Sequence, residues 1–151
     1  MSTTWVIAAG LTLALVAAVA APQGSTPTRR HIKLAGAAST LPFSDGVLAG
    51  ETLYLAGKLG IDPKSGQVPA DLDAELRFLF DSVREVLTAA GMTMDDLVSV
   101  QVFCPDLSLY DRFNTAYRAQ FKERLPARAF IGSGPLLRGA RFELQGIAVR
   151  G

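Results

Sequence analysis

Hydrophobic residues recur along positions 71–90 with the spacing of a helix that buries one side. Positions three and four apart lie on the same helix face, so this stripe is expected to face the protein core. Asp71 and Asp73 stand at the start, where carboxylates interact favourably with the positive end of the helix dipole. Gly91 follows, as is typical of a helix C-terminus. The stripe consists of Leu72, Leu76, Leu79, Phe80, Val83, Val86, Leu87 and Ala90.

A second helical pattern covers residues 109–123. Two capping-box sequences, in which Ser or Thr is followed three residues later by an acidic residue, precede it. Thr93–Asp96 predicts a short turn, and Ser108–Asp111 predicts the start of the second helix. The apolar side of this helix is expected to comprise Leu109, Phe113, Ala116, Tyr117 and Phe121.

The other apolar runs are short and bounded by glycine, proline or aspartate, which predicts strands. The runs at 47–49 and 52–59 are separated by two residues, so we expect a hairpin. The order of strands, helix, strand, helix and strands predicts an α+β domain: a single mixed sheet of about six strands with both helices packed on one face. The predicted strands are residues 31–34, 47–49, 52–59, 97–104, 128–133 and 141–149.

The N-terminal segment predicts export from the cytoplasm. Residues 5–21 are uncharged and apolar, and they end in small residues before a Pro/Gly/Ser/Thr-rich stretch. We therefore divide the chain into a signal peptide or N-terminal anchor at 1–21, a linker at 22–30 and a domain at 31–151. The expected location is periplasmic or secreted, or cytoplasmic if translation starts further downstream. No stable membrane partner is expected if the signal is cleaved.

Composition narrows the classes of function. The net charge is only +1, so the chain has no excess of basic residues that would indicate a nucleic-acid-binding surface, and no nucleic-acid partner is expected. One cysteine and one histidine cannot by themselves form a tetrahedral metal site, and the sequence predicts no metal and no cofactor. Cys104 is expected to be a buried inert thiol and His31 a solvated residue of an edge strand. The glycine-rich stretch 132–139 lacks the phosphate-loop pattern and is interpreted as a strand connection.

Arg128 is a permanent cation at the head of an apolar run, and burying it is costly unless an anionic group pairs with it. Because side chains alternate along a strand, Phe142 and Leu144 are expected to face the helices, and Glu143 and Gln145 to share the other face. If strands 128–133 and 141–149 are neighbours, Arg128 and Gln145 lie near each other. Two interpretations of Arg128 remain open: a structural ion pair with Glu143, or a bidentate contact with a ligand carboxylate.

Three segments carry a resemblance to a known family. They are LPFSDGVLAGETLYLAGKLGIDPKSG, then AAGMTMDDLVSVQVFCPDLSLYDRFNTAY, and then PARAFIGSGPLLRGARFELQGIAV, and they follow one another in this order within residues 41–149. The chain resembles the RidA/YjgF family of reactive-intermediate deaminases, which is also described as endoribonuclease L-PSP-like. The resemblance implies a chorismate mutase-like homotrimer with ligand clefts between subunits.

The resemblance also implies a reaction and a set of site residues. Family members hydrolyse enamines and imines of amino acids, such as 2-aminoacrylate, to 2-keto acids and ammonia. By position, Arg128 is the arginine that holds the substrate carboxylate, and Gly57 and Asn114 line the cleft. The position that holds a water-positioning glutamate in deaminating members is Gln145. The expected partner is therefore a small imino or keto acid.

Several cleft positions depart from the family pattern. Gln145 replaces the glutamate, Ala56 replaces a frequent serine, Phe43 replaces a tyrosine-type residue, and Phe130 stands where a cysteine is frequent. We expect Phe43 and Phe130 to contact the substrate and Arg128 and Gln145 to act in catalysis, with a more apolar ligand than 2-aminoacrylate. The alternative is a non-catalytic protein that binds small carboxylates, because an amide cannot take a proton. Ribonuclease activity finds little support in the sequence.

Overall fold

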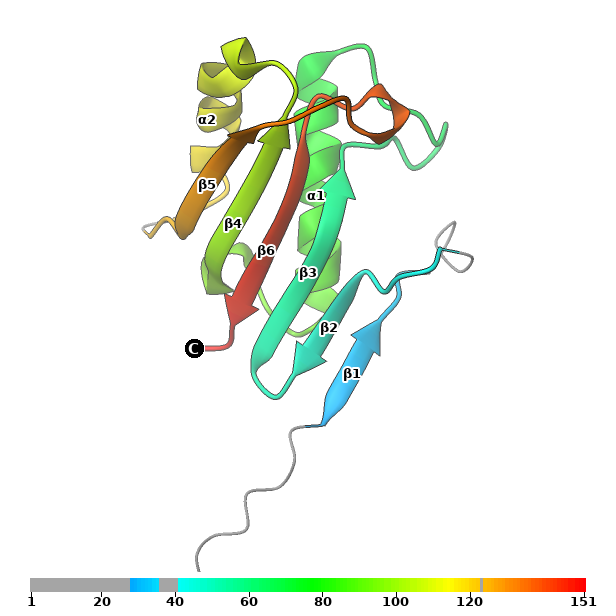
Figure 1. The fold of residues 1–151 in the computed structure, drawn as a ribbon. Helices are drawn as coiled ribbons and strands as arrows, with labels where there is room; N and C mark the ends of the chain where they lie inside the picture. The colour runs from blue at the N-terminus through cyan, green and yellow to red at the C-terminus, as the bar shows by residue number, and fades with distance from the viewer. Residues whose placement is uncertain (1–27, 36–40, 123) are drawn as a thin grey trace, which may run out of the picture.

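The computed structural model describes residues 28–35, 41–122 and 124–151 of the chain. Its strands form one six-stranded sheet in the order β1-β2-β3-β6-β4-β5. All neighbouring pairs are antiparallel except β4–β5, which is parallel, so the predicted mixed sheet is confirmed (Figure 1). The predicted signal or anchor lies outside the described residues. The strands are β1 (Arg29–Ile32), β2 (Gly46–Ala49), β3 (Thr52–Leu59), β4 (Leu97–Cys104), β5 (Ala127–Gly132) and β6 (Glu143–Val149).

Both helices cover the same face of this sheet, as the sequence predicted (Figure 1). Helix α1 (Leu72–Ala89) packs on β3 and β6, and its predicted apolar stripe is buried except for the partly exposed Leu72. Asp71 caps the helix by accepting a hydrogen bond from the Ala74 backbone N–H at 2.8 Å. Gly91 follows with φ of 73°, which favours glycine. No helix of the described ranges is long and apolar enough to cross a membrane.

The second helix begins and ends differently from the prediction. Helix α2 spans only Tyr110–Arg118, and the predicted capping box at Ser108–Asp111 is wrong. The Asp106 carboxylate instead accepts a hydrogen bond from the Ser108 backbone N–H at 3.0 Å and caps a 3₁₀ turn at Leu107–Leu109. This turn leads directly into α2. The capping box at Thr93–Asp96 is confirmed.

Side chains along β6 alternate between the two faces of the sheet, as the sequence predicts. Phe142, just ahead of the strand, and Leu144 are fully buried toward the helices. Glu143 and Gln145 lie on the opposite face, which no helix of the described residues covers (Figure 1). This open face of the sheet also exposes Tyr54, whose relative exposure is 52%.

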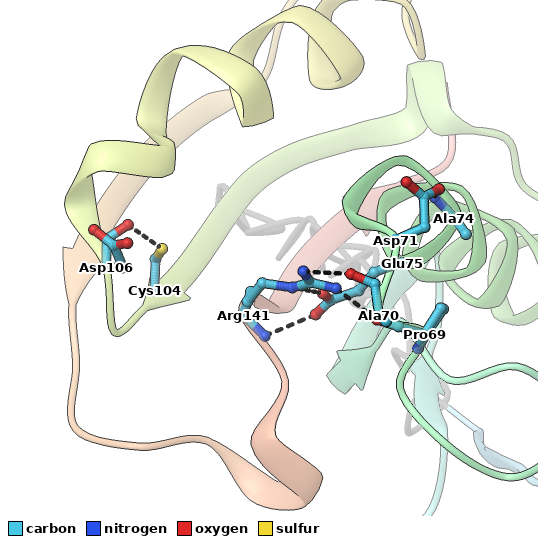
Figure 2. A network of polar contacts seen from close by, with 8 residues as sticks. All are labelled: Pro69, Ala70, Asp71, Ala74, Glu75, Cys104, Asp106 and Arg141. Carbon is cyan, nitrogen blue, oxygen red and sulfur yellow. Dashed lines mark hydrogen bonds and ion pairs between the residues drawn. The ribbon is translucent and has the colours of Figure 1, made fainter.

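The start of β6 is fixed by a buried carboxylate. Glu75 of α1 is 0% exposed, and it accepts hydrogen bonds from the Arg141 backbone N–H at 2.7 Å and from Arg141 Nε. The remaining guanidinium nitrogens donate to the backbone carbonyls of Ala70 at 3.0 Å and Pro69 at 2.6 Å. Figure 2 shows Arg141 reaching from the loop ahead of β6 to the first turn of α1. The pair therefore anchors Arg141, two residues before β6 begins at Glu143.

Candidate functional site

Arg128 of β5 points toward the helices and enters a cluster of aromatic rings. Its register partner on β4 is Val100, which is buried on the helix side. The guanidinium carbon lies between 4.6 and 5.8 Å from the centroids of four rings, and each contact is of the cation–π type. The rings belong to Tyr110, Phe113 and Tyr117 of α2 and to Phe130 of β5.

The polar partner of Arg128 is an amide rather than an acid. Its Nη2 donates to Asn114 Oδ1 at 2.7 Å, and no salt bridge of the described residues includes Arg128. The hypothesis of a structural ion pair with Glu143 is therefore wrong. Strand β4 lies between β5 and β6, so Arg128 and Gln145 are not neighbours within one chain. They also face opposite sides of the sheet.

Tyr117 completes this cluster with a buried hydroxyl that has no hydrogen-bond partner among the described residues. Burial raises the pKa of Tyr117 to about 12, although the charge of Arg128 acts in the opposite direction. A cavity of about 220 Å³ opens beside the cluster. We call Arg128, Asn114, Tyr117 and Phe130 the arginine half-site. The cavity is lined by Asn114, Tyr117, Arg118, Leu125, Pro126 and Arg128.

Gln145 lies in a hollow on the open face of the sheet. Its Nε2 donates to Gln101 Oε1 of β4 at 2.5 Å, which leaves the Gln145 carbonyl oxygen as an acceptor. The two residues are register partners across the β4–β6 pair. The hollow has a volume of about 340 Å³ and is lined by Tyr54, Leu55, Ser99, Gln101, Gln145, Gly146 and Ile147.

Gly57 lies on the same open face, at an irregularity in the β3–β6 pairing between Leu55 and Lys58. A Cβ atom at this position would lie 2.0 Å from Glu143 Oε1 and 3.0 Å from its carboxyl carbon. The Glu143 carboxylate therefore occupies the space that a side chain at position 57 would fill. A larger residue at position 57 would require the Glu143 carboxylate to move.

The loop that carries Phe43 is tied to the same part of β3. The Ala56 backbone N–H donates to the Asp45 carbonyl at 3.0 Å, and Lys58 Nζ pairs with the Asp45 carboxylate. Burial acts to raise the pKa of Asp45, but the hydrogen bonds from Lys58 and from the Leu34 N–H outweigh it and hold the pKa below its ordinary value. Phe43 itself is 50% exposed. We call Gly57, Gln101, Glu143 and Gln145 the open-face half-site.

Two other reactive residues lie apart from these groups. His31 is exposed, as expected, with its Nδ1 at 3.2 Å from Ser44 Oγ. Cys104 is buried, its thiol donates to the Asp106 carbonyl at 3.0 Å, and burial raises its pKa (Figure 2). Among the described residues, no group of three or more His, Cys, Asp or Glu side chains could hold a metal ion.

Sequence reasoning missed the contributions of Gln101 and Tyr117. The alternation in LVSVQVFC does place Gln101 on the face opposite Val100 and Val102, but its partner follows only from the β4–β6 register. The helical pattern places Tyr117 on the apolar side of its helix, where its ring does lie, but it gives no sign of the buried hydroxyl beside Arg128. A cavity of about 760 Å³ between α1 and the segments that follow β1 and β3 contains none of the predicted site residues.

Comparison with known proteins agrees with the resemblance. The family model described as Endoribonuclease L-PSP matches residues 34–150. The 2-iminobutanoate/2-iminopropanoate deaminase of Capra hircus is 36% identical over 129 residues, which cover 84% of this chain and 94% of that protein.

Two solved structures from Escherichia coli share the fold. The YjgF gene product matches with a TM-score of 0.75 at 32% identity and covers 81% of this chain and 99% of that chain. TdcF with bound serine matches with a TM-score of 0.70 at 27% identity, covering 81% and 94% of the two chains. The chain therefore belongs to the endoribonuclease L-PSP family, the RidA/YjgF family that its sequence resembles.

Proposed function

We propose that the protein hydrolyses imines or enamines of small amino acids to 2-keto acids and ammonia. The observation that carries the proposal is Arg128, a half-buried guanidinium among four aromatic rings with no carboxylate partner in the described residues. A partly desolvated cation of this kind favours a bound anion, and its fork matches a carboxylate. Support comes from the Capra hircus relative, named 2-iminobutanoate/2-iminopropanoate deaminase, and from TdcF, solved with bound serine, itself an amino carboxylate.

The cleft of this proposal lies between copies of a homotrimer. One chain holds the arginine half-site and the open-face half-site on opposite faces of its sheet, so it cannot bring them together. In the proposed trimer, the arginine half-site of one copy faces the open-face half-site of the next. The exposed Tyr54 beside the Gln145 hollow supports burial of this surface on assembly.

Within the cleft, Arg128 holds the substrate carboxylate and the Gln145 carbonyl orients the attacking water. The hydrogen bond from Gln145 Nε2 to Gln101 supports this role, because it fixes the amide with its oxygen available. Phe43 and Phe130 supply apolar walls, which favours substrates with an apolar side chain over 2-aminoacrylate. The reaction needs no group beyond the imine, water and a proton acceptor.

The test is an imine hydrolysis assay with the full chain. An amino-acid oxidase generates the imine, and semicarbazide captures the imine that escapes hydrolysis. We expect the wild type to speed keto-acid formation and Arg128→Ala to abolish the effect. Arg77→Ala, an exposed arginine of α1, is the matched control and should retain full activity.

The Gln145→Glu variant distinguishes an imine-hydrolysing enzyme from a protein that only binds small carboxylates. If the wild type is inactive and only Gln145→Glu hydrolyses imines, the natural protein is a non-catalytic binder of small carboxylates. Light scattering on the same samples tests the assembly. A mass of one protomer would contradict the cleft between subunits.

We further propose that residues 1–21 direct the protein out of the cytoplasm, as a cleaved signal or an anchor. The uncharged apolar run and the small residues before Pro22 support this. N-terminal sequencing of the protein purified from its native compartment tests it. A mature chain that begins after Ala20 or Ala21 is expected, and an intact Met1 in a cytoplasmic fraction would contradict it.

A further inference from the structure

Glu143 carries a half-buried carboxylate that lacks a side-chain partner in the part of the chain that the structure describes. Its Oε1 occupies the niche left by the missing side chain of Gly57. The two fully buried acids of the described residues are both paired, Asp45 with Lys58 and Glu75 with Arg141. Within the same ranges, the Glu143 carboxylate makes no hydrogen bond or salt bridge. A structural role in ion pairing therefore does not account for it.

The two residues directly opposite Glu143 in the sheet are apolar. Its register neighbours are Leu59 on β3 and Phe103 on β4. Lys58, one position away along β3, is engaged with Asp45. No cation from either adjacent strand therefore pairs with the Glu143 carboxylate.

We propose that Glu143 is the general base of the reaction, and that it replaces the glutamate that is absent at position 145. The proposal rests on the proposed function. Residues two apart on a strand point to the same face with Cα atoms about 7 Å apart, a spacing that one water can bridge. That water donates one hydrogen bond to the Gln145 carbonyl and one to the Glu143 carboxylate. Gln145 then positions the water, and Glu143 takes its proton.

The chemistry balances with Glu143 alone as the proton carrier. The water oxygen forms a bond to C2 of the protonated imine while the C=N electron pair moves to nitrogen and Glu143 takes a proton from the water. Glu143 returns this proton to the amine. As the C–N bond breaks, the hydroxyl proton passes to Glu143, and the departing ammonia collects it. The products are the 2-keto acid and ammonium, and Glu143 is regenerated as a carboxylate.

The start of β6 gives this carboxylate a fixed place. The Glu75–Arg141 network holds the residue two positions before Glu143, and the carboxylate itself lies in the space beside Gly57. Rigid support from a strand suits a group that must lie within hydrogen-bond reach of a reacting water.

The experiment compares kcat, KM and the pH dependence of imine hydrolysis in the wild type and Glu143→Gln. We expect kcat to fall by about 10²–10⁴-fold, the range for loss of a general base, with little change in KM. The acid limb of the wild-type pH–rate profile should disappear in Glu143→Gln. Glu143→Asp should restore part of kcat and the acid limb, which a purely structural role would not produce.

Two further variants test the same point. Glu51→Gln, the same substitution in the exposed β2–β3 turn, is the matched control and should leave kcat unchanged. Gly57→Ala should lower kcat as Glu143→Gln does, because its Cβ displaces the carboxylate. Thermal melts of each variant verify that the domain remains folded.

The outcomes separate this inference from the proposed function. If the wild type hydrolyses imines and Glu143→Gln retains its rate and its acid limb, the inference alone is overturned. If Gln145→Ala, and not Glu143→Gln, removes the acid limb, the inference is likewise wrong. If the folded wild type does not hydrolyse imines at all, the proposed function fails first and the inference fails with it.

Discussion

Two partly buried arginines, Arg128 and Arg141, show opposite uses of the same side chain. Arg141 is surrounded by acceptors: the buried Glu75 carboxylate and the carbonyls of Pro69 and Ala70 (Figure 2). Arg128 has one amide acceptor and four aromatic rings. Each of the three guanidinium nitrogens of Arg141 donates a hydrogen bond within the fold, whereas only Nη2 of Arg128 does, which leaves donors for a ligand. The difference teaches that the partners of a guanidinium, more than its burial, distinguish a structural from a binding role.

The largest expected difference between the two arginines is in catalytic activity, when Arg128 is replaced. Arg128→Met is expected to lower kcat/KM for a 2-imino acid by roughly 30- to 3000-fold, because truncating one partner of a close charge pair costs about 2–5 kcal/mol. Its melting temperature should change little. The measurement is steady-state kinetics beside thermal melting. A loss of stability in Arg128→Met equal to that of Arg141→Met would break the comparison.

The next effect is on stability and concerns the other arginine. Arg141→Met leaves the Glu75 carboxylate buried without its partner, so we expect a loss of about 3–5 kcal/mol in the free energy of unfolding. Urea denaturation at neutral pH measures it. The double variant Glu75→Gln/Arg141→Met should recover part of the loss. If the single variant is as stable as the wild type, the network of Figure 2 does not hold β6 in place.

A smaller effect concerns Tyr117 beside Arg128. The folded pKa of Tyr117, about 12, exceeds the unfolded value of 10.0, so the unfolded state loses its proton first as the pH rises. The free energy of unfolding is therefore unaffected by this group below pH 10 and falls by about 2–3 kcal/mol in total as the pH rises toward 12. Tyrosinate absorbance should show a late-titrating group that Tyr117→Phe removes. Arg128→Met should delay this group further, since the arginine charge favours the phenolate. A titration unaffected by Arg128→Met would contradict their coupling.

The smallest effect is expected at Asp45, because burial raises the pKa of its carboxyl and hydrogen bonds lower it. Its folded pKa lies below the ordinary value, so its contribution to stability is present above pH 4 and is lost as the pH falls through the folded pKa. Asp45→Asn should flatten the acid side of the stability–pH curve, measured by urea midpoints. An unchanged slope would show that Lys58 and Asp45 do not act as a structural pair like Glu75 and Arg141.

Much of the fold could be predicted because local patterns agree with it. The stripe of α1 and the alternation at Phe142 and Leu144 follow from the periods of helix and strand. The end of α2 could not be predicted, since its apolar pattern continues to Phe121 although the helix ends at Arg118. The capping box predicted at Ser108–Asp111 does not form, because the Ser108 backbone N–H donates to the Asp106 carboxylate and not to that of Asp111.

The candidate site was harder to predict than the fold. Arg128, Asn114 and Phe130 do come together, and their meeting depends on α2 packing over β5. The separation of Arg128 from Gln145 follows from strand order, which places β4 between their strands and which no local pattern encodes. The Glu143 niche depends on the pairing irregularity beside Gly57, and this too is a property of the assembled sheet.

The placement of Arg128 and Gln145 on opposite faces of one sheet has a genetic consequence. In the proposed trimer, each cleft takes its arginine from one chain and its amide from the next. A chain that lacks Arg128 and a chain that lacks Gln145 would therefore rebuild some intact clefts when they are co-expressed. Two inactive alleles of this gene would complement each other when their lesions lie in different half-sites, and would fail to do so when both lie in the same one.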